Sequence, residues 1–109
     1  MPYSRQLADR VRQTLGKQRG LAEKRMFGGV GFLLRGNMLA CIWEQSLIVR
    51  LGLDEAAKAL KEPNVREFDV TGRPMRGWVI VDPDGLERDE QLAAWLARAQ
   101  AFVETLPAK

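Results

Sequence analysis

The sequence contains no histidine and only one cysteine, Cys41. Histidine is the commonest general acid–base group in enzymes and the commonest zinc ligand, so its absence argues against an active site or a zinc site. A single cysteine cannot form an internal disulfide, and we therefore expect a cytoplasmic protein. Cys41 lies within an apolar stretch, where we expect it to be buried and inert. We predict that the protein is not an enzyme and holds no cofactor or metal.

Long apolar runs are also lacking, because no stretch approaches the roughly 20 residues that cross a membrane. The first six residues have no apolar core of the kind found in secretory signals. The 109 residues, of which 46% are hydrophobic, suffice for one core and leave no room for a second. We expect a single domain over residues 1–109 and no membrane partner.

Charge is distributed unevenly along the chain, whose net charge is +3. Residues 1–25 hold seven basic and two acidic side chains, whereas residues 82–109 hold three basic and six acidic ones. This asymmetry indicates an anionic partner, association of two copies into a homodimer, or simply two solvated helix faces. The candidate contacts for an anion or a nucleic acid are Arg5, Arg12, Arg19, Lys24 and Arg25.

Apolar periodicity predicts helices at both ends of the chain. Tyr3, Leu7, Val11 and Leu15 recur every four residues, which is typical of an amphipathic helix. A second amphipathic stripe extends from residue 92 to residue 106, after Asp89 as its expected cap. A shorter helix is expected at residues 55–61, with Asp54 as the cap and Pro63 after its end.

Five apolar segments predict an antiparallel sheet. Residues 30–35, 38–43 and 47–51 form a three-stranded meander whose first turn is expected at Gly36-Asn37. Two further strands are expected at residues 66–70 and 78–81. The order of elements is α-β-β-β-α-β-β-α. We predict a two-layer α+β domain in which helices pack on an antiparallel sheet.

The glycine-rich segment before the first of these strands has a structural interpretation. Its glycines lead into a strand rather than a helix and do not fit the spacing of a dinucleotide loop. We expect Gly28 and Gly29 to permit a bulge or a close backbone approach, and Met26 and Phe27 to fill the core.

A cluster rich in arginine is the candidate interaction surface. It comprises Arg73, Met75, Arg76 and Trp78, residue types that recur at binding hot spots. The alternative is that Trp78 belongs to the core and the arginines are solvated. Arg50 is a charge inside an apolar strand, and we expect it to face solvent or to pair with Glu67 or Asp69.

Several motifs together resemble a known family. The run KRMFGGVGF at residues 24–32, followed by GNM at 36–38 and LIVR at 47–50, is similar to the N-terminal domain of TfoX/Sxy-type competence regulators. RPMRGW at 73–78, with Leu92 and Trp95, extends the likeness to the last helix. The resemblance implies the order of elements given above, in a fold like that of secretion chaperones. Members with a second, C-terminal domain activate DNA-uptake genes, and we expect this chain to be a stand-alone N-terminal domain.

Three functional hypotheses follow. The leading one is a non-catalytic regulatory or protein-interaction domain, such as a transcription co-regulator, whose partner is another protein. The alternative is direct nucleic-acid binding through the basic N-terminal residues, with a steep salt dependence. The third is a small-molecule sensor with a pocket near Phe27 and Trp78.

Overall fold

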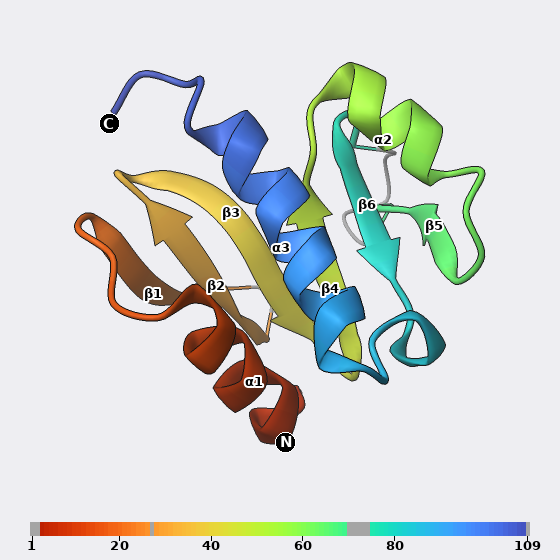
Figure 1. Ribbon diagram of the computed structural model, residues 1–109, viewed down its shortest axis with the longest axis horizontal. Coiled ribbons are helices and arrows are strands. Elements are labelled where there is room, and N and C mark those ends of the chain that lie inside the picture. The colour runs from red at the N-terminus through yellow and green to blue at the C-terminus, as the bar shows by residue number, and fades with distance from the viewer. Residues whose placement is uncertain (1–2, 27, 70–74, 109) are drawn as a thin grey trace.

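The computed structural model describes residues 3–26, 28–69 and 75–108, without the side chain of Met26. Within these residues the chain forms three α-helices, six strands and one short 3₁₀ helix (Figure 1). In chain order they are α1 (Arg5–Leu15), β1 (Leu21–Met26), β2 (Gly29–Leu34), β3 (Asn37–Trp43), β4 (Ser46–Arg50), α2 (Leu53–Ala59), β5 (Val65–Glu67), β6 (Trp78–Val81), η1 (Pro83–Gly85) and α3 (Asp89–Val103).

All six strands form one antiparallel sheet in the order β1-β2-β3-β4-β6-β5. The first four strands follow one another as hairpins. After β4 the chain passes through α2 to the far edge, forms β5, and returns as β6 between β5 and β4. The predicted α+β class and the order of the predicted elements are confirmed.

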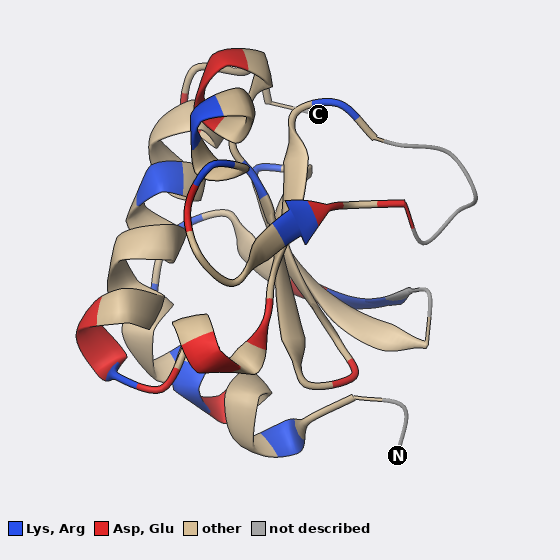
Figure 2. Cartoon of the chain, turned by 90° about the vertical axis from the view of Figure 1, so that its right-hand side faces the viewer, with Lys and Arg blue, Asp and Glu red and all other residues tan. Residues whose placement is uncertain are grey.

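The helices lie on one side of this sheet, as its edge-on view in Figure 2 shows. The main core contains apolar side chains from α1, α3 and the strands, among them Val11, Phe32, Val49 and Leu96. A smaller cluster of Cys41, Ile48, Phe68 and Ile80 is separate from it, with Met38, Trp43 and Trp78 packed against its edge. The predicted two layers are therefore a sheet and a layer of helices.

Strand β1 is absent from the sequence-based expectation. Its residues 22–25 are exposed, and three of them are charged, so the strand lacks the apolar alternation that would have predicted it. A strand of this kind suits a sheet edge, where charged side chains discourage pairing with other chains.

The helix and turn boundaries also differ from expectation. Gly52 and Arg88 occupy the N-cap positions of α2 and α3, so Asp54 and Asp89 lie in the first turns instead of capping the helices. These acids still stabilise the helices, because their negative charge lies at the positive, N-terminal end of the helix dipole. The β2–β3 hairpin turns at Arg35 and Gly36, which have φ values of 53° and 84°.

The glycine-rich segment has the expected structural role. A Cβ atom added to Gly29 would overlap the carbonyl oxygen of Ile42 on the neighbouring strand β3. Gly28 has a φ of 74°, in the left-handed region that favours glycine. The expected close approach of backbone is confirmed, whereas Phe27 and the side chain of Met26 lie outside the described residues.

We expect Gly29→Ala to destabilise the protein by about 2–3 kcal/mol, because the backbone oxygen that meets the new methyl group cannot rotate away. Gly16→Ala is the matched control. Gly16 has a positive φ, of 65°, which Gly29 does not, and an added Cβ there has no atom within 4 Å, so its cost is about 1–2 kcal/mol from conformation alone. Urea unfolding of both variants measures the difference. Equal losses of stability would contradict the close approach.

Candidate functional site

The residues of the predicted interaction surface lie where strand β6 begins. Met75 and Arg76 are exposed, Trp78 is half-buried, and Arg73 falls outside the described residues. The ring of Trp78 packs against Phe68, with 5.9 Å between ring centroids. One part of Trp78 therefore belongs to the smaller apolar cluster, and another part remains available at the surface.

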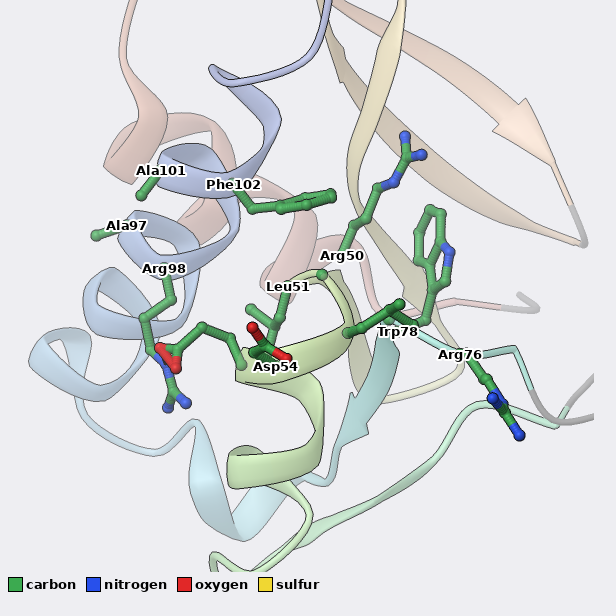
Figure 3. Close-up of a pocket in the computed structure, with 13 residues that line it drawn as sticks. Arg50, Leu51, Asp54, Arg76, Trp78, Ala97, Arg98, Ala101 and Phe102 are labelled. Carbon is green, nitrogen blue, oxygen red and sulfur yellow. Dashed lines mark ion pairs between the residues drawn. The ribbon is translucent and has the colours of Figure 1, made fainter.

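A groove of about 860 Å³ opens beside Trp78 (Figure 3). The end of β4, the start of α2, the start of β6 and the last turns of α3 form its walls. We call it the Arg50 groove, and the side chains that matter in it are Arg50, Leu53, Asp54, Trp78, Arg98 and Phe102. Arg76 contributes to its rim, but its side chain points away from the rings of Trp78 and Phe102.

Two glycines shape the floor of the groove. The carbonyl oxygen of Gly77 accepts hydrogen bonds from the backbone N–H groups of Leu51, at 2.8 Å, and of Gly52, at 3.1 Å. Gly52 and Gly77 have φ values of +85° and +89°, which other residues rarely adopt. A Cβ on Gly52 would also lie only 2.6 Å from the ring of Phe102. Glycine at both positions allows the backbone at residues 51–52 to contact Gly77 and the ring of Phe102 to pack on Gly52.

Arg50 lies between two aromatic rings of the groove. Its guanidinium carbon is 5.4 Å from the centroid of Trp78 and 5.7 Å from that of Phe102. Trp78 is its direct neighbour on strand β6, so the sheet register holds one side of this arrangement. Both distances are within the range of cation–π attraction. The side chain is half-buried, and among the described residues it forms no ion pair.

One of the two expectations for Arg50 is not met, because neither Glu67 nor Asp69 pairs with it among the described residues. The side chain is partly exposed, as the other expectation has it, and its guanidinium in addition lies against two aromatic rings. Sequence reasoning singled out Arg50 as unusual but did not connect it with Leu53 or Phe102. The signal was weak because these residues are separated by up to 52 positions in the chain.

Arg98 is the second arginine of the groove, and it is already neutralised. It forms ion pairs with Glu62 at 2.9 Å and Glu55 at 3.8 Å, while its guanidinium carbon lies 4.5 Å from the centroid of Trp95. These contacts tie α3 to α2. Arg98 thus has a structural role that Arg50 lacks.

One large exposed apolar side chain lines the groove. It is Leu53, the first residue of α2, which is 66% exposed. Met75, directly before the rim residue Arg76, and Leu60, at the other end of α2, are each 37% exposed, and neither lines the groove. Sequence reasoning identified Met75 and missed Leu53, which no periodic pattern marks.

Three of the five basic candidates lie together. Arg12, Lys24 and Arg25 line one small pocket with Glu23. Arg12 donates hydrogen bonds to Glu23 at 2.7 and 2.8 Å and to Asp9 at 2.6 Å, so carboxylates already occupy it. The remaining two, Arg5 on α1 and Arg19 beyond its end, are exposed.

The uneven charge of the chain is partly satisfied within one molecule. Arg10 near the basic start pairs with Asp89 near the acidic end at 3.2 Å. The hydrogen bonds between Arg12 and Glu23 lower the pKa of the Glu23 carboxyl group and raise the pKa of the Arg12 guanidinium.

Metal and thiol chemistry find little support in the described residues. None of their acidic and cysteine side chains form a group of three that could hold a metal ion. Cys41 is buried, as expected, and its burial raises the pKa of the thiol from 9.0 to about 11. No helix in the described part of the chain is long and apolar enough to cross a membrane.

Comparison with known proteins adds a family. The family model of the TfoX N-terminal domain matches residues 13–103 of the 109, a range that includes every residue of the groove and the glycine-rich segment. No curated protein and no solved structure matches the chain.

The Arg12–Glu23 ion pair predicts how the stability of the folded protein depends on pH. Because the pKa of Glu23 is lowered by folding, the pair stabilises the protein above about pH 4.5 and loses its effect as the pH falls through the folded-state pKa. We expect Glu23→Gln to cost about 1 kcal/mol or less at pH 7, since both side chains are more than one-third exposed. Chemical denaturation from pH 7 to pH 3 should show the two proteins converging.

The control for this experiment is Glu87→Gln, which changes an exposed carboxylate that takes part in no ion pair among the described residues. Its stability should follow that of the wild type at every pH. A Glu23→Gln deficit that stays constant down to pH 3 would show that the ion pair is not its cause.

Proposed function

The chain belongs to the TfoX N-terminal domain family, and from this premise we propose that it is a non-catalytic regulatory domain that binds another protein through the Arg50 groove. The family is not known as an enzyme family, and membership is consistent with a regulatory or interaction role. Regulation of transcription, as in the competence regulators, is the context that we propose for this binding.

The observation that carries the proposal is the large apolar side chain of Leu53, which lines the groove and remains exposed. Leu53 is the most exposed large apolar side chain of the described residues, and it adjoins the rings of Trp78 and Phe102. Protein interfaces typically combine a few apolar and aromatic anchors with arginine. Leu53, Trp78 and Arg50 supply these three kinds of group on one surface.

The chemistry of the groove supports binding rather than catalysis. Its carboxylates are Asp54 and Glu55, and Glu55 already pairs with Lys58 and Arg98. No histidine exists in the chain to act as a base, and the one cysteine is buried elsewhere with a raised pKa. A nucleophile and a base within reach of each other, which catalysis by side chains usually needs, are not found among the groove residues.

The two alternative functions remain weaker proposals. A small-molecule sensor would use the same groove at Trp78, although Phe27 lies outside the described residues. Nucleic-acid binding loses the support of Arg12, whose guanidinium is occupied by Glu23 and Asp9. Association of two copies stays a prediction.

We expect Leu53→Asn and Met75→Asp each to weaken partner binding about tenfold or more, because they remove exposed apolar anchors. Affinity capture from lysate with the wild-type chain, followed by mass spectrometry, identifies the partner. Calorimetry with the purified partner then gives the affinity of each variant. The melting temperatures should stay close to that of the wild type because both side chains project from the surface.

Leu60→Asn is the matched control for Leu53→Asn. It removes an exposed leucine from the same helix but outside the groove, so it should leave the affinity unchanged. The groove is not the interaction surface if Leu53→Asn binds the partner as tightly as the wild type.

Fluorescence anisotropy with a labelled DNA duplex tests the nucleic-acid alternative. We expect no binding that weakens steeply with salt, because Glu23 and Asp9 neutralise Arg12 and leave few phosphate contacts at this end of the chain. Tight binding at low salt that is lost in the Arg5→Glu/Arg19→Glu double variant would replace our proposal with direct DNA binding.

A further inference from the structure

We propose that the Arg50 groove recognises an extended segment of its partner in which an aspartate or glutamate is followed by a large apolar residue. The carboxylate binds the guanidinium of Arg50, and the apolar side chain packs against Leu53 and Phe102. This inference rests on the proposed function, since it specifies the partner segment for that same site.

The first argument is the state of charge of Arg50. Two arginines of the described residues lie against aromatic rings in this region. Arg98 has two carboxylates beside it, whereas Arg50 has none. A half-buried cation without a counter-ion gains more from an incoming carboxylate than one that water surrounds, because screening is weaker there. Among the groove arginines, Arg50 is therefore the one that aromatic rings hold in place and that no carboxylate occupies.

The second argument is that Arg50 is already held in place. The ring of Phe102 lies on one side of it and that of Trp78 on the other (Figure 3). Trp78 is itself held by its packing on Phe68. A guanidinium presents its N–H donors as a rigid planar fork that fits the two oxygens of a carboxylate. Because packing limits its motion before binding, less side-chain entropy is lost when a carboxylate arrives.

The third argument concerns what flanks the carboxylate. Apolar side chains border Arg50, and Leu53 remains 66% exposed without a partner. Asp54, next to Leu53, lies below the guanidinium of Arg50 in Figure 3 and would repel a second acid at that end. The groove therefore selects one acid beside Arg50 and an apolar residue beside Leu53, rather than a uniformly acidic segment.

Titration with short peptides tests this inference on the full-length chain. The probes are blocked pentapeptides in which glutamate or aspartate precedes leucine or phenylalanine, and matched peptides with glutamine or asparagine in place of the acid. NMR spectra of the ¹⁵N-labelled protein report the indole N–H of Trp78 and the side-chain N–H of Arg50. We expect acidic peptides to bind about tenfold more tightly than their amide counterparts.

The protein variants complete a double-mutant cycle. Arg50→Gln should reduce the affinity for acidic peptides to that for the amide peptides and leave the latter unchanged. Arg50→Lys, which retains the charge but not the fork, should give an intermediate affinity. Arg19→Gln is the control, because Arg19 is an exposed arginine outside the groove. The NMR spectra also verify that each variant is folded. If Arg50→Gln fails to fold, the comparison of acidic and amide peptides on the wild type decides alone.

Three results would overturn the inference. The first is binding of none of the acidic peptides, and the second is equal binding of acidic and amide peptides. The third is tighter binding of phenylacetate than of any peptide, which would assign the groove to a small aromatic anion. The proposed function is judged separately. A partner whose binding depends on Leu53 but not on Arg50 would leave that function standing and reject the acidic segment.

Discussion

The arrangement of this domain depends on one backbone contact, in which the carbonyl oxygen of Gly77 accepts hydrogen bonds from the N–H groups of both Leu51 and Gly52. These hydrogen bonds join the end of β4 to the start of β6. The pairing of β4 with β6 connects the first four strands of the sheet to its last two. The contact includes Gly52, the N-cap residue of α2, and it lies next to the pairing of Arg50 with Trp78. Both glycines have positive φ, so the constraint lies in the backbone itself.

Charge pairing within the chain determines which arginines remain for a partner. Arg12, Arg66 and Arg98 each contact a carboxylate at 3.1 Å or less, and these pairs link neighbouring elements. Arg50 instead contacts aromatic rings, which attract a cation but do not cancel its charge. A search for clustered basic residues therefore points to the N-terminal region, whereas Arg50, which has no carboxylate beside it among the described residues, lies in a groove at the end of the central strand β4.

Much of the fold was predictable because its signals are local. Periods of four and of two residues, with cap and turn signals, identified three helices and five strands, although the first hairpin turn lies one residue before its expected place. Strand β1 escaped because its exposed residues 22–25 carry no apolar alternation, and only pairing with β2 makes it a strand. Of the groove residues, Arg76 and Trp78 were identified as an interaction surface, Leu53 and Phe102 were not, and the carboxylate partner expected for Arg50 is replaced by two aromatic rings.

The sequence by itself determined the α+β class, the order of the predicted elements, the family and the need for glycine beside strand β2. These follow from periodicity and motifs, which depend on residues close together in the chain. Only the tertiary structure decided that residues 50–55, 76–78 and 97–102 form one groove, and that in it carboxylates flank Arg98 while aromatic rings flank Arg50. The physical reason is that burial and charge pairing depend on distances in space between segments that sequence periodicity does not relate.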